Sequence, residues 1–381
     1  MIPASYVDPR DGRRYPLDVP RWCSDERMPL LVTPGAGISR DDIESRTRSL
    51  WRYRASLPVG IADPITIGEG CTPLVQRPWG DLRPLFKLEW FNPTGSFKDR
   101  GSSVMLSFLR QIGVDAVLED SSGNGGSSVA GFGAAGGLRV KILAPASTSP
   151  AKIAQVRAYG AEVQLVEGPR EESEAEAIRQ SDRTFYASHN WQPFFLEGTK
   201  TLAYEIWEDL GFKAPDNVVM PVGAGSSLLG CAFGFRELLK AGQIAKLPRL
   251  FAAQPLNCSP IDASFQAGMD TPVARAVHKT IAEGTAIKRP MRLGEIIAAI
   301  RESEGGTVAL SEEEIVCALG RLARQGLFAE PTCASAAAAL DKLSSAGSIK
   351  AGETTVVIVT GTGLKAASTV ADLVQQDESR S

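Results

Sequence analysis

The stretch Val218–Gly230 (VVMPVGAGSSLLG) decides the fold class, because an apolar, β-branched run leads directly into glycines and serines. The uncharged apolar character continues to Phe235, and a run of this length raises the question of a membrane span. Proline, glycine and serine interrupt the run repeatedly, which favours a strand, a tight turn and a helix start over a membrane helix. The stretch therefore predicts a strand–glycine–helix junction.

The same alternation of strand-like and helical segments extends outward from this junction, beginning near residue 69. It is typical of an α/β protein whose strands are mainly parallel. The expected strands are Leu85–Leu88, Ala116–Leu118, Val140–Leu143, Val163–Val166, Val218–Met220, Leu250–Ala253 and Val356–Thr360. The expected helices are Gly101–Ile112, Lys152–Tyr159, Glu171–Asp182, Lys200–Leu210, Ser227–Lys240, Ser311–Gln325 and Cys333–Ala346.

Residues 1–68 are predicted to form an N-terminal extension, rich in proline and arginine. Helical periodicity appears only at Asp41–Tyr53, where we expect a helix. The first residues lack the basic start and the apolar core of a signal peptide, so none is expected.

The composition argues against several classes of partner and catalytic site. A net charge of −3 over 381 residues gives no electrostatic footprint for nucleic acid or a membrane surface, so neither is expected as a partner. Six scattered cysteines without a Cys-x-x-Cys pair favour a reducing cytoplasm. With only two histidines, a histidine-rich metal site or a Ser-His-Asp triad is not expected. We interpret His189 and His278 as local polar contacts.

One lysine lies where a helix is predicted to begin. In Asn92–Gly101 (NPTGSFKDRG), the first residues form a turn and Ser96 is expected to cap the helix that follows. Lys98 would then lie in the first helical turn, where the helix dipole disfavours its ammonium form. Such a lysine is a nucleophile that condenses with an aldehyde. The alternative is a surface lysine beside Asp99 and Arg100, and this segment alone does not decide between the two.

Two glycine-rich turns follow predicted strands. The turn Ser121–Ser128 (SSGNGGSS) exposes backbone N–H groups that can bind a carboxylate, and Asn124 adds an amide donor. The turn Gly223–Ser227 suits a phosphate, because Ser226 and Ser227 add hydroxyls at a helix N-terminus. Ordinary loop packing is the alternative for both.

A third glycine motif, Gly131–Gly136, matches the dinucleotide pattern but falls inside the predicted helix Ser127–Ala135. A dinucleotide site needs those glycines directly after a strand, so we do not expect one here.

Another predicted strand ends at Thr360, in the position where ligands bind in open α/β sheets. One lysine, a phosphate turn, an asparagine turn and a strand-end hydroxyl are together the groups that pyridoxal phosphate (PLP) requires.

These segments resemble the fold-type II PLP-dependent enzymes, and within them threonine synthase. Glu69–Leu74 (EGCTPL), Asn92–Gly101 and Glu197–Thr201 (EGTKT) are similar to motifs of that family. The resemblance implies that Lys98 holds PLP as a Schiff base and that Asn124 binds the ring oxygen. It also implies that Thr360 meets the ring nitrogen. The residues implied to hold the phosphate are Gly223, Ala224, Gly225, Ser226 and Ser227.

The resemblance also implies the architecture. We expect an α/β fold of two domains with mainly parallel twisted sheets, similar to the tryptophan synthase β chain, with the cofactor in the cleft between them. Residues 69–100 and 190–381 would form the large PLP-binding domain and residues 101–189 the small domain. A cytoplasmic homodimer is what the family implies.

Three departures from the family concern the substrate and a metal. Phe195 stands where the motif Asn-Pro-x-Arg-x-Glu-Gly has the arginine that grips a substrate phosphate, and phenylalanine offers no charge-assisted donor. Gly125 replaces a threonine after the asparagine of the Ser-Gly-Asn turn. The segment from Asp8 resembles a zinc ribbon, but only Cys23 remains among its ligands, so no metal is expected.

The resemblance and these residues together imply a PLP-dependent lyase of the threonine-synthase type, which catalyses elimination or replacement at the β or γ carbon of a small amino acid through an external aldimine. Lys98 would remove the α-proton. The alternatives are a serine- or threonine-type ammonia-lyase, a β-replacement enzyme on an unphosphorylated amino acid, and a PLP-binding protein without turnover. Phe195 is included with the residues expected to bind the substrate; the others are Ser122, Gly123, Gly125, Gly126 and Ser127.

Overall fold

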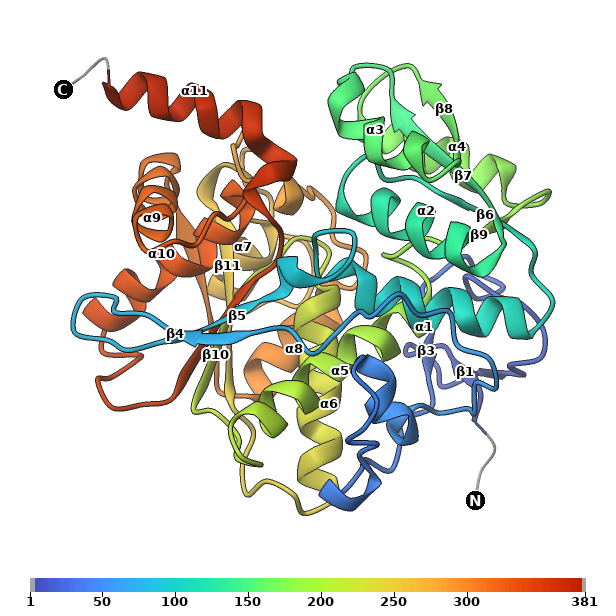
Figure 1. The fold of residues 1–381 in the computed structure, drawn as a ribbon, viewed down its shortest axis with the longest axis horizontal. Coiled ribbons are helices and arrows are strands. Elements are labelled where there is room, and N and C mark those ends of the chain that lie inside the picture. The colour runs from blue at the N-terminus through green and yellow to red at the C-terminus, as the bar shows by residue number, and fades with distance from the viewer. Residues whose placement is uncertain (1–3, 379–381) are drawn as a thin grey trace. The chain divides into compact units, whose positions relative to one another are not determined.

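The computed structural model describes residues 4–378 and divides into two compact units (Figure 1). Unit 1 comprises Met1–Cys71, Asn92–Thr94 and Lys98–Leu202, and unit 2 comprises Thr72–Phe91, Gly95–Phe97 and Ala203–Ser381. The chain is an α/β protein, as predicted. The three-part domain division drawn from the sequence stays a prediction.

Unit 1 is built on a four-stranded parallel sheet in the order β8-β7-β6-β9. Its strands are Ala116–Glu119 (β6), Arg139–Pro145 (β7), Glu162–Val166 (β8) and Phe185–Tyr186 (β9). Its helices are Lys98–Gln111 (α1), Asn124–Gly136 (α2), Pro150–Ala158 (α3), Arg170–Gln180 (α4) and the first part of Pro193–Asp209 (α5). Helices α2 and α4 pack on β7, which buries Val140 and Ile142.

Unit 2 is built on a six-stranded sheet in the order β12-β11-β10-β13-β5-β4, in which only β4 runs antiparallel to its neighbour. Its strands are Leu74–Gln76 (β4), Leu85–Leu88 (β5), Asn217–Pro221 (β10), Arg249–Pro255 (β11), Gly306–Leu310 (β12) and Thr355–Val359 (β13). Its helices are Ser226–Lys240 (α6), Pro260–Gln266 (α7), Leu293–Glu302 (α8), Glu312–Arg324 (α9), Pro331–Ser345 (α10) and Ala367–Glu378 (α11).

The core of unit 2 explains why its central strands read as continuous apolar runs. Val219, Phe251 and Val357 project from one face of the sheet into a cluster with side chains of α9 and α10. Successive side chains of a strand point to opposite faces, so the intervening residues Val218 and Val356 project the other way, and they are also fully buried. Strands covered on both faces are the norm in parallel sheets. Within residues 4–378, none of the helices has the length and apolar character needed to cross a lipid bilayer.

The N-terminal segment differs from expectation at one place. The helix predicted at Asp41–Tyr53 is wrong, because the chain forms two short 3-10 helices, Arg40–Asp42 and Leu50–Ser56. Ser49 begins the second one by accepting a hydrogen bond from the Trp51 backbone N–H. The apolar positions that suggested one helix are therefore contributed by two separate turns.

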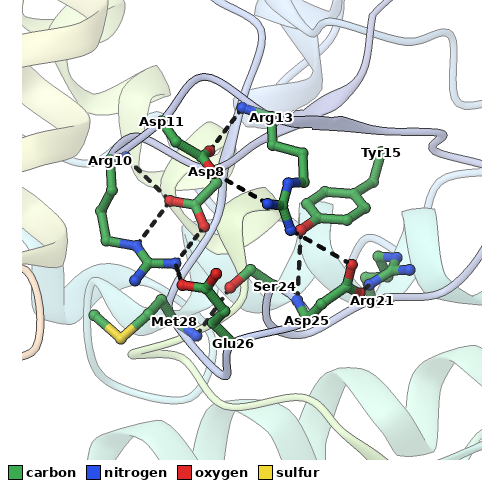
Figure 2. Close-up of polar contacts among 10 residues, drawn as sticks. All are labelled: Asp8, Arg10, Asp11, Arg13, Tyr15, Arg21, Ser24, Asp25, Glu26 and Met28. Carbon is green, nitrogen blue, oxygen red and sulfur yellow. Dashed lines mark hydrogen bonds and ion pairs between the residues drawn. The ribbon is translucent and has the colours of Figure 1, made fainter.

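A three-stranded antiparallel sheet precedes these turns, with Tyr6–Val7 (β1) between Arg14–Tyr15 (β2) and Leu31–Val32 (β3). Figure 2 shows the polar network around it. The buried Asp8 carboxylate accepts two side-chain hydrogen bonds from Arg10, at 3.0 and 2.7 Å, and Arg10 also pairs with Glu26 at 2.8 Å. These bonds hold the pKa of Asp8 down at about 2.

No cluster of three or more His, Cys, Asp or Glu side chains suited to a metal ion occurs within residues 4–378. Cys23, the remaining residue of the zinc-ribbon pattern, is half-buried and makes no disulfide. The absence of zinc stays a prediction.

Candidate active site

Lys98 is the first residue of α1, as the sequence predicts, and its side chain is half-buried. The preceding turn is fixed by Asp99, whose carboxylate accepts the Thr94 backbone N–H at 2.7 Å and the Thr94 hydroxyl at 2.5 Å. The same carboxylate accepts the Ser128 hydroxyl of α2 at 2.6 Å. The helix start that carries Lys98 is therefore tied to the glycine-rich helix α2.

The expectation that Ser96 caps this helix is wrong. Within the described residues, the Ser96 hydroxyl is buried and forms no hydrogen bond. The bonds that fix the turn come from Asp99 instead, whose two carboxylate oxygens accept both Thr94 donors.

The Ser-Gly-Asn turn lies where β6 ends and α2 begins, and Asn124 is the first residue of α2. The chain doubles back so tightly here that a Cβ at Gly126 would collide with the Ser121 carbonyl oxygen. The Ser127 N–H already bonds to the Gly123 carbonyl at 3.0 Å. The helix N-terminus leaves other N–H groups of this turn available for an anion.

Sequence reasoning missed a buried ionisable pair next to this turn. His189 Nδ1 lies 2.7 Å from the Glu119 carboxylate, and the His189 backbone N–H donates to the other carboxylate oxygen at 3.0 Å. A Cβ at Gly125 would lie only 2.7 Å from His189 Nδ1, so the histidine ring occupies the space that a side chain at position 125 would need. His189 thus makes a polar contact, as interpreted from the sequence, with a partner 70 residues earlier in the chain.

Phe195 lies in the same part of unit 1. Its ring is fully buried, and the centroid is 5.8 Å from that of His189 and 5.6 Å from Lys98 Nζ. A Cβ at Gly101 would approach the Phe195 ring to 2.5 Å, so the glycine one turn after Lys98 makes room for it. The structure therefore brings Lys98, Phe195 and the turn around Gly125 together, and their role in substrate binding stays a prediction.

In unit 2, the predicted phosphate turn and Thr360 lie at one edge of the sheet. β10 and β13 are parallel neighbours, and the turn Gly223–Ser227 follows the first while Thr360 follows the second. Gly225 adopts a left-handed conformation with φ of 89°, and a Cβ there would strike Ile296. Only glycine is accommodated at this position without strain.

The turn Gly223–Ser227 fits a phosphate group. A Cβ at Gly223 would meet the Thr285 backbone at 3.0 Å, so the turn packs closely against the segment around Thr285 and has no room for a side chain at position 223. Helix α6 begins at Ser226, and the first N–H groups of a helix have no partners within the helix. Backbone donors, hydroxyls and the positive end of a helix dipole match a phosphate dianion.

Thr360 is 3 % exposed, and its hydroxyl lies 3.3 Å from the Cys333 sulfur of α10. The Gly361 backbone N–H donates to the same sulfur at 3.1 Å, and the Thr360 carbonyl accepts the Phe97 N–H at 3.0 Å. Burial raises the pKa of the Cys333 thiol to about 12, so it is a neutral neighbour of the hydroxyl. Cys333 carried no signal in the sequence.

Comparison with known proteins identifies the class. A family model described as pyridoxal-phosphate dependent enzyme matches residues 65–361, so the chain belongs to this family and uses pyridoxal phosphate. Its fold is that of the fold-type II enzymes. The processed form of threonine deaminase isoform 2 from Solanum lycopersicum superposes with a TM-score of 0.69 at 25 % identity, covering 80 % of this chain and 83 % of that one.

Curated relatives narrow the class further. Threonine synthase from Methanosarcina acetivorans is 34 % identical over 348 residues, which is 89 % of this chain and 85 % of the relative. Threonine synthase from Methanocaldococcus jannaschii is 35 % identical over 338 residues, covering 86 % and 83 %. The chain is thus a PLP-dependent lyase of the threonine-synthase type.

Proposed function

We propose that the chain catalyses elimination, with or without addition of a second nucleophile, at the β or γ carbon of a small amino acid. The observation that carries this proposal is the position of Lys98 at the start of α1. There it is fixed through Asp99 and lies beside the glycine-rich start of α2. Bound PLP would supply an electron sink for the carbanion at the α-carbon.

Residues of this chain would bind the cofactor and the substrate and would move the proton. Lys98 Nζ would hold the cofactor and, once released by the substrate, take up the α-proton. Asn124 would donate to the ring oxygen, and the Gly223–Ser227 turn would hold the phosphate. Thr360 would meet the ring nitrogen, and because its hydroxyl is neutral it would not provide a full proton there, which would favour elimination over transamination. The backbone N–H groups of Ser122, Gly125 and Gly126 would hold the substrate carboxylate. Those of Gly123 and Ser127, also expected there from the sequence, already donate to the Ser121 hydroxyl and the Gly123 carbonyl.

Phe195 favours a second candidate within this function, an ammonia-lyase or β-replacement enzyme for an unphosphorylated amino acid. A phosphate on the substrate needs charge-assisted donors, and the buried Phe195 ring provides none. Gly125 contributes no hydroxyl either. The relatives are named threonine synthases, so both substrate classes need to be tested on the same preparation.

The deciding experiment mixes the PLP-loaded protein with O-phosphohomoserine and measures threonine and inorganic phosphate. Parallel reactions with serine and threonine are assayed for ammonia and a 2-oxo acid. Release of threonine and phosphate supports the threonine synthase reaction. Ammonia and a 2-oxo acid support the second candidate. Absence of turnover with every substrate, although PLP is bound, contradicts the proposal.

We further infer a cytoplasmic homodimer, with the large and small domains at the boundaries predicted from the sequence. The family resemblance supports the dimer. The six cysteines, none of which forms a disulfide, support a reducing compartment.

A further inference from the structure

The buried pair of Glu119 and His189 has no part in the reaction as proposed so far. Glu119 ends β6 with no exposed surface, and His189, 5 % exposed, lies in the segment that leads into α5. Two hydrogen bonds join the pair: the His189 backbone N–H donates to the Glu119 carboxyl group, and His189 Nδ1 shares a second hydrogen bond with it. Burying a carboxyl group and an imidazole together is costly, which indicates a specific use.

The pair lies beside the groups assigned to the substrate. The His189 ring is 5.8 Å from Phe195, whose own centroid is 5.6 Å from Lys98 Nζ. The ring also fills the space next to Gly125. The pair therefore borders the positions where this chain lacks both the phosphate-gripping arginine and the threonine hydroxyl of the family pattern.

The surroundings keep the pair uncharged near neutral pH. Burial raises the pKa of Glu119 to about 8, so the carboxyl group keeps its proton. Burial, and next the positive charge of Lys98, lower the pKa of His189 well below its usual value, so the imidazole stays neutral. Asp120, Arg170 and Tyr186 are the other ionisable groups that act on this pair. In this neutral pair the carboxyl group of Glu119 holds the acidic proton that the pair can give away.

We infer that the Glu119–His189 pair donates a proton to the leaving group, and that the substrate is an amino acid with a hydroxyl on its β-carbon. This inference rests on the elimination proposed above. Phosphate leaves as an anion and needs cationic donors, whereas hydroxide is a poor leaving group that needs a proton. The pair can supply the proton that hydroxide needs. Phe195 stands where the cationic donor for a phosphate would be.

In the proposed step, Lys98 Nζ takes the α-proton, and the electron pair of that bond forms the Cα=Cβ double bond. The Cβ–O bond breaks and its electrons pass to the oxygen, which accepts the proton of the pair and leaves as water. The pair, now one proton short, is reprotonated from the Lys98 ammonium or from solvent.

A comparison of leaving groups tests the inference. L-Serine and β-chloro-L-alanine differ in that hydroxide requires a proton and chloride does not. In His189→Asn, kcat/KM for serine should fall by about 100-fold or more, the usual contribution of a general acid. The value for β-chloroalanine should change by less than about threefold, a loss of well under 1 kcal/mol. Glu119→Gln, which keeps the carbonyl acceptor, should show the same selective loss.

The chain provides a matched control, because His278, the second of its two histidines, is exposed. His278→Asn should leave both substrates unaffected. An equal loss with serine and β-chloroalanine in His189→Asn would show a structural role and overturn the inference. Wild-type turnover of β-chloroalanine without turnover of serine or threonine would overturn the substrate class, while the proposed elimination would stand. Failure with every substrate would overturn the elimination and the inference together.

A measurement independent of turnover examines the pair itself. Nitrogen NMR of the PLP-loaded protein reports the protonation of both imidazoles, and His278→Asn assigns the remaining signals to His189. The inference predicts a neutral His189 ring at pH 7 whose nitrogen shifts change in Glu119→Gln. A doubly protonated His189 at pH 7, or shifts indifferent to Glu119→Gln, would contradict it.

Discussion

Lys98 Nζ lies 5.6 Å from the centre of the Phe195 ring, which is fully buried. An ammonium group at this distance is attracted to the face of an aromatic ring. In the family pattern an arginine occupies the position of Phe195, so an aromatic contact stands where a second positive charge would be. The surroundings of Lys98 therefore lack the second positive charge that the family pattern provides for a phosphorylated substrate.

Replacement of that ring by a cation should favour phosphorylated amino acids. In Phe195→Arg, the KM for O-phosphohomoserine should fall by about tenfold or more, because a charge-assisted hydrogen bond contributes about 1.5–3 kcal/mol. Initial rates over a substrate series measure this change. Phe195→Leu is the control, since it removes the ring without adding charge. Equal KM values in the two variants would show that position 195 does not contact a substrate phosphate.

The Ser-Gly-Asn turn should tolerate a methyl group at one glycine and not at another. Gly126→Ala places a Cβ against the Ser121 carbonyl and should cost about 1–3 kcal/mol of stability. It should also weaken PLP binding, measured by absorbance on titration with the cofactor. Gly123→Ala is the matched control, because a Cβ there meets no atom within 4 Å. Equal PLP affinity in both variants would contradict the role of this turn.

The N-terminal sheet should lose stability in acid through Asp8. Its pKa of about 2 lies below the usual 3.8, so its contribution is complete above pH 3.8 and disappears as the pH falls through 2. Asp8→Asn should destabilise the sheet at pH 7 by about 1 kcal/mol, since the Arg10 partner is partly exposed. Hydrogen exchange of the β1 and β2 amides measures the effect. A difference from wild type that persists unchanged at pH 2 would exclude Asp8 as the cause.

The sequence predicts the central strands and the glycine turns well for a physical reason. β10 and β13 are buried on both faces, so their residues are uniformly apolar and β-branched. Glycine is required at positions 225 and 126 because a Cβ there would collide with neighbouring atoms, so these two turns can be recognised from their glycines. Lys98 was expected in the first turn of its helix and is the first residue of α1, three residues before the predicted start at Gly101.

Other features depend on contacts that no local pattern records. β12 and α8 were not predicted; β12 is only partly buried, and α8 has no side-chain cap to mark its start. Glu119 and His189 are 70 residues apart, and each is unremarkable within its own segment. The helix predicted at Asp41–Tyr53 failed because its apolar residues serve two separate turns.

Locating the cofactor on the chain tests the central claim most directly. The PLP-loaded protein is treated with borohydride, which makes the bond between PLP and its lysine permanent, and the modified peptide is identified by mass spectrometry. The account predicts a phosphopyridoxyl group on Lys98, absent in Lys98→Ala together with turnover. The group on another lysine, or normal turnover in Lys98→Ala, would contradict it.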